Sequence, residues 1–312
     1  MSIVHTHASG KVILLGEHAV VYGQPAIAVP VSQVGVDVTI EVCKTPARVL
    51  SEGIGLDEPI DNLPNTHPIK KAIGLFLHET SVGKLGNVMI RIRSSIPVAS
   101  GLGSGAAVSV ALLRALDAHF GAHLDAAKIN ELAYEVEKIH HGTPSGIDNS
   151  VIAYAKPVYY TKGLPIETFI VASPIHLLVA DTGVGALTKV AVSDVRYLTQ
   201  EQPEKFMPLI EKIGDLVRQG RQAMEFGDLP LLGQIMLQDQ ELLRQLTVSS
   251  PELETLIKAA MGAGALGAKL SGGGRGGNMI ALVRDQANLA SVTESLLSAG
   301  ARAVYQATVS PS

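Results

Sequence analysis

The sequence has few of the residues that mark secreted or nucleic-acid-binding proteins. Its 312 residues include one cysteine, Cys43, and no tryptophan, and only 17% are charged. A single cysteine cannot form a disulfide within the chain, which is typical of a reducing compartment. With 25 Lys and Arg against 29 Asp and Glu, the chain has no basic field that could hold a polyanion. These features predict a cytoplasmic protein that binds neither nucleic acid nor an anionic membrane.

Long apolar runs are also lacking. The N-terminal residues MSIVHTHASGKVILLGEH contain no basic segment followed by an apolar run, so they do not predict a secretory leader. The uncharged stretch between Arg93 and Arg114 contains one proline, three glycines and several serines. A membrane-spanning helix needs about 20 predominantly apolar residues. We therefore expect this stretch to be a loop that leads into a buried helix.

Glycine and aliphatic side chains are abundant instead. The chain has 31 glycines, and 46% of its residues are hydrophobic while only 4% are aromatic. Such a composition excludes intrinsic disorder and predicts a core of Ala, Val, Ile and Leu. A length of 312 residues suits two domains of ordinary size.

Strand and helix patterns follow one another in mixed order, with no internal repeat. Strands are predicted at 12–15, 26–29, 34–42, 88–96, 151–160, 175–180, 268–283 and 301–309, and helices at 68–78, 106–119, 125–140, 208–220, 229–246, 251–262 and 289–299. Residues 51–66 are predicted to form a surface loop because they are rich in Asp, Asn, Gly and Pro. This order predicts an α+β fold. Prolines near residue 170 suggest two domains, 1–170 and 171–312.

A glycine loop precedes the predicted helix 106–119, with the sequence PVASGLGSGAA over residues 97–107. Glycines allow backbone N–H groups to approach a ligand, and a helix N-terminus attracts anions, so the loop could hold phosphate. A tight turn with close helix packing is the alternative. The spacing also matches a dinucleotide-binding fingerprint, but that motif requires a strand after the helix, and here a second helix follows. A Walker loop is excluded, because the Gly-Lys pairs precede Val12 and Leu85 and not Ser or Thr.

Three further segments could carry chemistry or only structure. Glu137 falls at the border of the apolar face of helix 125–140, where its carboxylate could reach solvent or bind a cation. A second Glu-x-x-His helix is not evident, which excludes a di-iron site. The turn HHGTPSGIDN at 140–149 would aim Ser145 and Asp148. A second glycine loop, SGGGRGG at 271–277, is either a hairpin turn or a close backbone approach.

Taken together, four segments resemble the GHMP kinase superfamily and, within it, the mevalonate kinase family. They are GKVILLGEHAVVYGQPAIA at 10–28, PVASGLGSGAA at 97–107, GTPSGIDN at 142–149 and KLSGGGRGG at 269–277. The segments occur in the order of the family and span most of the chain. The resemblance implies a two-lobed fold with the active site in a cleft, transfer of the γ-phosphoryl group of ATP to the 5-hydroxyl of mevalonate, and, from relatives, a homodimer.

The same resemblance implies roles for individual residues. Asp148 would orient or deprotonate the substrate hydroxyl, with Lys11 beside it, and Glu137 would hold Mg²⁺. Contacts to the substrate would come from Glu17, His18, Ser145 and Thr188. The phosphates of ATP would be bound by Pro97, Ala99, Ser100, Gly101, Leu102, Gly103, Ser104, Gly105 and Ala106. Gly272, Gly273 and Gly274 would press against the phosphate-binding loop.

The chain departs from the family pattern at Gly105, where a serine usually offers its hydroxyl to Mg²⁺. A water could take that position, since Mg²⁺ usually keeps several waters, or Ser104 could replace the missing ligand. Arg275 stands where a small residue is common, so it would add a positive charge to the cleft or point to solvent. Two alternatives to mevalonate phosphorylation remain at this stage: another small-molecule kinase, acting on phosphomevalonate or a sugar, and a metabolite-binding regulator without catalysis.

Overall fold

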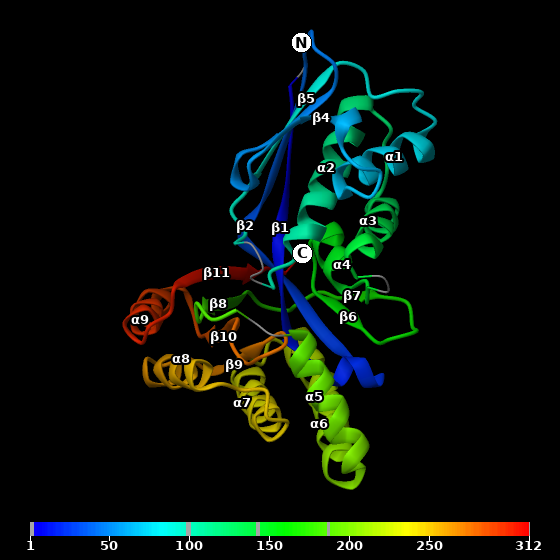
Figure 1. Ribbon diagram of the computed structural model, residues 1–312. Helices are drawn as coiled ribbons and strands as arrows, with labels where there is room; N and C mark the ends of the chain where they lie inside the picture. Colours follow the sequence, from blue (N-terminus) through cyan, green and yellow to red (C-terminus); the bar gives the residue numbers. More distant parts are fainter. Residues whose placement is uncertain (1–2, 98–100, 142–143, 186–187, 312) are drawn as a thin grey trace. The chain divides into compact units, whose positions relative to one another are not determined.

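A computed structural model describes residues 3–97, 101–141, 144–185 and 188–311 (Figure 1). The chain forms two compact units. The first comprises Met1–Gly10, Val34–Val98 and Leu102–Ala155, and the second comprises Lys11–Gln33, Ala99–Gly101 and Lys156–Ser312. Strands β1 (Val4–Leu15) and β2 (Ala26–Val42) run through both units. The domain division at residue 170 stays a prediction, whereas the contacts group residues 11–33 with the C-terminal part.

In the first unit, the C-terminal part of β2 pairs with β5 (Val88–Ser94) in antiparallel register. β5 pairs in parallel with β3 (Arg48–Ser51), and β3 pairs with β4 (Leu56–Pro59). Short 3-10 helices η2 (Glu52–Ile54) and η3 (Ile60–Asn62) flank β4. Four helices pack on one another along one side of these strands (Figure 1). They are α1 (Pro68–Thr80), α2 (Ser104–Phe120), α3 (Ala126–His141) and α4 (Ile147–Tyr154).

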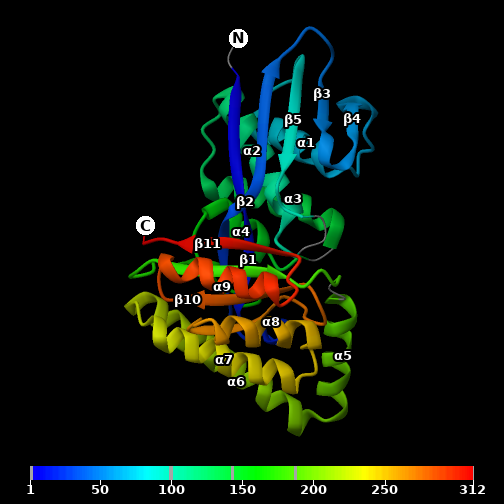
Figure 2. The same cartoon turned by 90° about the vertical axis from the view of Figure 1, so that its left-hand side faces the viewer.

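The second unit is built on an antiparallel sheet with the strand order β11 (Ala303–Val309), β8 (Ile175–Asp181), β10 (Asn278–Val283), β9 (Gly267–Ser271). Every residue of β9 and β10 is buried, so both faces of these strands are covered. Figure 2 shows α8 (Pro251–Gly262) and α9 (Gln286–Ser298) side by side, and both pack on the sheet.

The second unit also contains further helices and short strands. Helix α7 (Leu229–Gln245) packs on β9 and on α6 (Pro203–Phe226), and α6 also contacts α5 (Thr188–Glu201) and the 3-10 helix η1 (Ala19–Tyr22). Strand β6 (Val158–Tyr160) pairs with residues 26–28 of β2 and with β7 (Glu167–Thr168). The α+β class predicted from the sequence is confirmed, and so is a core made mainly of Ala, Val, Ile and Leu.

Several sequence predictions are wrong in detail. Residues 151–154 end helix α4 and are not part of a strand, because α4 is buried on most sides and its apolar run resembles that of a buried strand. The predicted loop 51–66 contains β4, η2 and η3, and helix α5 was not predicted. Helix α6 starts at Pro203, continues through Pro208 and passes Gly220. A Cβ at Gly220 would lie 2.3 Å from Leu15 Cδ1, so glycine here allows close packing within the helix and does not mark its end.

The uncharged stretch between Arg93 and Arg114 leads into α2, as predicted. In the described part of the chain, no helix is both long and apolar enough to cross a membrane.

Two glycines allow α7 to lie directly on β9. A Cβ at Gly233 would lie 2.3 Å from the Leu266 carbonyl oxygen, and a Cβ at Gly267 would lie 2.3 Å from the Gly233 carbonyl oxygen. Both obstacles are backbone atoms, which cannot move aside as the end of a side chain can. This contact fixes the position of the following turns of α7, which carry Asp239 and Gln240.

We expect Gly233→Ala to lower the free energy of unfolding by about 1–3 kcal/mol, as overpacking of a tight interior does. Urea unfolding followed by circular dichroism measures this change. Gly74→Ala is the matched control, because Gly74 is an exposed glycine within α1 with nothing near its Cβ position. The control should be neutral or more stable by up to about 1 kcal/mol, the helix-propensity gain of alanine. Equal stability of the Gly233→Ala variant and the native chain would contradict the close contact.

Candidate active site

The glycine loop ends in the first turn of α2. Gly103 has φ 76° and caps the helix in the left-handed conformation, and α2 starts at Ser104, two residues before the predicted start. The first helical hydrogen bond joins Ala107 N to Gly103 O at 2.9 Å, so the N–H groups of the preceding turn point out of the helix end. This arrangement suits an anion. The sequence-predicted residues Ala99 and Ser100 lie outside the described residues.

Glu137 on α3 faces this turn. Its side chain is only 4% exposed, so the carboxylate is buried and does not reach solvent. A Cβ at Gly105 would lie 3.2 Å from Glu137 Oε1, which places the carboxylate beside the position where the family usually has a serine. The hydroxyl of Ser109, one turn further along α2, donates to the Gly105 carbonyl at 3.1 Å.

The donor chemistry at this position fits Mg²⁺. A hard carboxylate oxygen stands at a helix end that suits phosphate, and Mg²⁺ in kinases is commonly held by one or two carboxylates together with phosphate oxygens and water. The described residues contain no group of three or more His, Cys, Asp or Glu side chains that could hold a metal by themselves. A cation here would therefore share its ligands with a phosphate.

Asp148 lies in the first turn of α4, and residues 142 and 143 of the turn predicted at 140–149 lie outside the described residues. Gly146 caps the helix with φ 85°, and the Ser145 hydroxyl accepts a hydrogen bond from Ile147 N at 3.3 Å. The buried Asn149 and Ser150, which follow Asp148, donate to Asn130 Oδ1 at 2.6 and 3.1 Å. Asn130 thus ties α4 to α3, two turns before Glu137. Asn130 was not predicted as a functional residue, although it is the only residue with an amide side chain in helix 125–140.

In the second unit, β1 ends in a strained turn that carries Glu17 and His18. Both side chains are buried, with 1% and 5% exposure. His18 has φ 60° and ψ −45°, a conformation that costs energy for a residue with a Cβ and that concentrates at functional sites. Its Nε2 lies 3.1 Å from the Gly273 carbonyl oxygen. Since a carbonyl only accepts, Nε2 carries the proton.

Burial keeps the His18 ring neutral, since it lowers the pKa of His18 to about 4. Nδ1 is then a hydrogen-bond acceptor, and it has no partner among the described residues. The same holds for Glu17 Oε2, which is also buried. Two buried acceptors on adjacent residues therefore lack a protein donor, and donors such as the hydroxyl groups of a ligand would satisfy them.

Lys269 contacts the turn that carries Glu17 and His18, and it was not predicted as a site residue. It is completely buried on β9, and its Nζ lies 2.6 Å from Glu17 Oε1, 2.7 Å from the Leu270 carbonyl oxygen and 3.4 Å from Asp239 Oδ2. Burial raises the pKa of Asp239 to about 7 and also raises the pKa of Glu17, against the opposing effect of the Lys269 charge. A single lysine within a buried apolar strand was the available sequence signal, whereas nothing singled out Asp239.

The second glycine loop connects β9 to β10 and contacts the start of α5. A Cβ at Gly273 would lie 2.7 Å from Oγ1 of Thr188, the first residue of α5. Arg275 does not simply point to solvent, because its guanidinium forms an ion pair with Asp194 on α5. The backbone N–H of Arg275 donates to the Val248 carbonyl at 2.7 Å. The loop is thus a β-hairpin connection that also approaches another backbone closely, so both readings of this segment hold.

The structure gathers the sequence-predicted residues within each unit. In the first unit it joins Gly105 with Glu137 and links α4, which carries Asp148, to α3. In the second it joins Glu17, His18 and Thr188 around the second glycine loop. Lys11 is buried in the part of β1 that belongs to the second unit.

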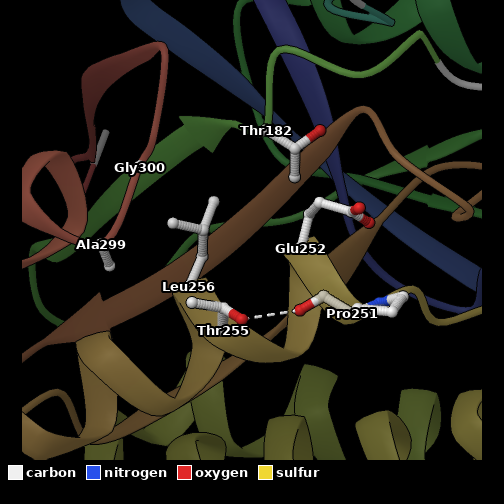
Figure 3. A pocket seen from close by; sticks show the side chains of 7 residues that line it. All are labelled: Thr182, Pro251, Glu252, Thr255, Leu256, Ala299 and Gly300. Atoms are coloured by element: carbon white, nitrogen blue, oxygen red, sulfur yellow. Dashed lines mark hydrogen bonds between the residues drawn. The ribbon is translucent and has the colours of Figure 1, made fainter.

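A separate cavity of about 270 Å³ lies in the second unit (Figure 3). Its lining consists of Thr182, Pro251, Glu252, Thr255, Leu256, Ala299 and Gly300. The Thr255 hydroxyl donates to the Pro251 carbonyl at 2.8 Å and is therefore already occupied within its own helix. None of the sequence-predicted site residues lines this cavity.

The buried titratable groups make stability depend on pH in opposite directions. Asp239 binds its proton more tightly in the folded chain, since its pKa rises from 3.8 to about 7, so stability is lost as pH rises from about 4 to 7. The pKa of His18 falls from 6.5 to about 4, so its contribution is gained as pH rises from about 4 to 6.5. We expect Asp239→Asn to gain stability relative to the native chain over this range, by about 1.4 kcal/mol per pH unit at most.

Urea unfolding at several pH values between 4 and 7 measures this difference. Asp215→Asn is the control, because Asp215 is an exposed residue of α6. Stability curves that run parallel for Asp239→Asn and the native chain would contradict a buried, protonated Asp239.

Comparison with known proteins identifies the family of the chain. The family "GHMP kinases N terminal domain" matches residues 67–156, and "GHMP kinases C terminal" matches residues 211–302. The mevalonate kinase of Thermococcus sibiricus is 34% identical over 299 residues, which cover 89% of each chain. The mevalonate kinase of Aeropyrum pernix is 34% identical over 302 residues, which cover 92% of each chain.

A solved structure is similar along nearly the whole chain. The crystal structure of L. major mevalonate kinase in complex with R-mevalonate has a TM-score of 0.85 and 32% sequence identity, and it covers 99% of this chain and 96% of that chain. The identity and coverage of these relatives, together with the two domain matches, show that the chain belongs to the mevalonate kinase family of the GHMP kinases.

Proposed function

We propose that this protein transfers the γ-phosphoryl group of ATP to the 5-hydroxyl of mevalonate. The observation that carries the proposal is the buried Glu137 carboxylate beside the first turn of α2, directly after the glycine loop. This arrangement offers a phosphate site and a cation ligand at one place. Family membership supplies the acceptor, because the relatives named above are mevalonate kinases.

The nucleotide phosphates would lie at the N-terminus of α2. Backbone N–H groups of Ser104, Gly105 and Ala106 would donate to phosphate oxygens, in place of a Walker lysine. The proposed phosphate-binding residues also include Pro97, Ala99, Ser100 and Gly101–Gly103. Phosphoryl transfer requires chiefly positioning and charge stabilisation, which such a loop supplies.

Glu137 would hold Mg²⁺, which neutralises charge on the phosphates when it is bound. Gly105 contributes no side-chain ligand, and Mg²⁺ keeps several waters in most sites, so a water would occupy the place of the serine hydroxyl. The half-buried Ser104 would be the alternative ligand.

The acceptor hydroxyl would lose its proton to Asp148, at the start of α4. General-base catalysis suits a carboxylate whose backbone is fixed, and the Asn130 hydrogen bonds fix α4. The positive charge of Lys11 would favour the ionised form of the base and the developing negative charge.

The remaining contacts to the acceptor would come from Glu17, His18, Ser145 and Thr188. Glu17 Oε2 and His18 Nδ1 are acceptors without partners among the described residues, so they suit hydroxyl donors. Mevalonate carries two hydroxyl groups and fits this requirement. A cytoplasmic location and a homodimer remain predictions from the sequence.

The test is turnover by the purified protein. With ATP, Mg²⁺ and mevalonate it should release ADP and form 5-phosphomevalonate. A panel containing phosphomevalonate and galactose separates the other kinases of the superfamily, and binding of ATP with no turnover on any acceptor would identify a regulator. Absence of turnover on mevalonate by folded protein rejects the proposal.

We expect Asp148→Asn to lower kcat by about 10²-fold or more, because the amide cannot accept the proton. The Kd of the nucleotide should change by less than about twofold, since the base acts on the acceptor. Stopped-flow turnover and calorimetric nucleotide binding measure the two quantities. Asp125→Asn is a control at a helix start away from the proposed chemistry, where the carboxylate only caps α3. A surviving kcat in Asp148→Asn would remove Asp148 as the base.

Gly105→Ser should lower the Mg²⁺ concentration needed for half-maximal activity by several-fold, because its hydroxyl would stand beside Glu137. Gly105→Ala is the matched control, since it adds the same Cβ without the hydroxyl. Its Mg²⁺ requirement should equal that of the native chain or exceed it. An identical requirement in the Ser and Ala variants would show that a hydroxyl at residue 105 does not reach the metal.

A further inference from the structure

Lys269 is a charged residue at a place where an apolar residue would be expected. It lies on β9 with all of its side chain buried, and its partner across the β9–β10 ladder is Ile280. Its neighbours along the strand, Ala268 and Leu270, are also fully buried. Taking an ammonium group out of water is strongly unfavourable unless its charge and its donors are compensated. The groups that contact the Lys269 ammonium therefore indicate the role of its charge.

The Lys269 ammonium makes contacts of unequal strength. Its shortest contact is 2.6 Å to Glu17 Oε1, a length typical of a strong charge-assisted hydrogen bond. The Leu270 carbonyl accepts a second bond at 2.7 Å, and Asp239 Oδ2 stands at 3.4 Å. Neither oxygen of Asp239 has a hydrogen-bond partner among the described residues.

The charges in this cluster can be assigned from these contacts. Two carboxylates share one ammonium, so one of them must carry a proton if the buried cluster is to be neutral. Glu17 is closer to Lys269 and also accepts a hydrogen bond from the Gly272 backbone. Asp239 has the weaker contact, and burial raises its pKa to about 7. Burial raises the pKa of both carboxyls, so the contacts distinguish them: the bonds that Glu17 accepts from Lys269 and Gly272 favour the negative charge on Glu17 and the proton on Asp239.

Helix α7 holds Lys269 in place from the other side. Gln240, next to Asp239, accepts a hydrogen bond from Leu270 N at 2.9 Å, and the close approach of Gly233 to β9 fixes the same helix. Lys269 therefore has a fixed position, and it fixes the Glu17 carboxylate in turn. Glu17 is adjacent to the strained His18, whose ring is bonded to Gly273.

We propose that Lys269 is a positioning residue for the acceptor substrate. Its ammonium, held by the Leu270 carbonyl and by α7, keeps Glu17 ionised and oriented, so that Glu17 Oε2 is available to a substrate hydroxyl. Lys269 does not itself touch the substrate. This inference rests on the proposed function of Glu17 as a substrate contact.

Steady-state kinetics of Lys269→Met, Glu17→Gln and the double variant test the proposal. Without the ammonium, the buried Glu17 carboxylate must take up a proton, so Lys269→Met and Glu17→Gln leave a neutral group at residue 17 alike. Each should raise the KM for mevalonate about tenfold or more, while the nucleotide Kd changes less than twofold. The double variant should be no worse than the poorer single variant, because the two residues act as one unit.

Two controls separate positioning from stability. Asp239→Asn replaces a protonated carboxyl by a neutral amide of the same shape and should leave KM within twofold. Lys258→Met removes an exposed lysine of α8 and should change neither KM nor the thermal midpoint. A Lys269→Met variant that loses thermal stability but keeps the native KM would overturn the proposal, as would effects of the single variants that multiply in the double variant.

The double variant also allows the proposal to be tested if Lys269→Met does not fold. If Lys269→Met does not fold, Lys269→Met with Glu17→Gln should fold, because it leaves no buried unpaired charge. A double variant that folds and has native KM would overturn the proposal.

A measurement without substrate separates this inference from the proposed function. If the native chain phosphorylates another acceptor of the panel, the same kinetics use that acceptor. If it phosphorylates none, the proposed function fails, and the ¹⁵N resonances of the His18 ring in the free protein then test whether Lys269 positions Glu17. Lys269→Met and Glu17→Gln should shift these resonances alike, and Asp239→Asn should not. Native resonances in Lys269→Met would reject the positioning role.

Discussion

The buried ion pair between Lys269 and Glu17 is the interaction on which the second unit depends. It joins the turn after β1 to the central strand β9, two segments that are 252 residues apart in the sequence. An ion pair out of water is tolerated only when its remaining donors and acceptors are satisfied. The Leu270 carbonyl and the Gly272 backbone meet part of this requirement, whereas Glu17 Oε2 and both oxygens of Asp239 have no hydrogen-bond partner among the described residues. The close packing of α7 on β9, the hairpin loop and the strained His18 are all arranged around that pair.

In the first unit, the main feature is the position of the Glu137 carboxylate at the N-terminal end of α2. The glycine loop leaves the N–H groups of the α2 start open, and α3 brings Glu137 to within 3.2 Å of the Cβ position of Gly105. Asn130 on α3 accepts hydrogen bonds from Asn149 and Ser150 on α4, so it connects the helix that carries Glu137 to the helix that carries Asp148. The phosphate site and the proposed base therefore share one support, whereas the acceptor contacts Glu17 and His18 belong to the other unit.

The accuracy of the sequence predictions follows from how local each signal is. Helix α1 was predicted from Pro68, and α3 from Asp125, whose carboxylate accepts from Lys128 N at 2.8 Å. The strand predicted at 151–154 was wrong, because an apolar run buried on most sides has no periodicity that distinguishes a helix from a strand. Strand β9 is also buried on both faces and has no periodicity. The local sequence around Lys269 therefore does not indicate which residue its ammonium contacts. The proposed site residues remain predictions as ligands, although Glu137 is buried against the turn where the resemblance placed it.

The sequence by itself determined the family, the α+β class and the segments that carry the chemistry, because the glycine loops and the residues between them are contiguous motifs whose conformations are set locally. Only the tertiary structure decided which side chains share a proton or a charge. No motif marks Asp239 or Asn130, and the motif that begins at Lys269 does not indicate its partner; these residues matter because folding brings them against side chains of other elements. Desolvation is a property of the folded chain, so the pairing of Lys269 with Glu17 could not be read from residues 252 positions apart.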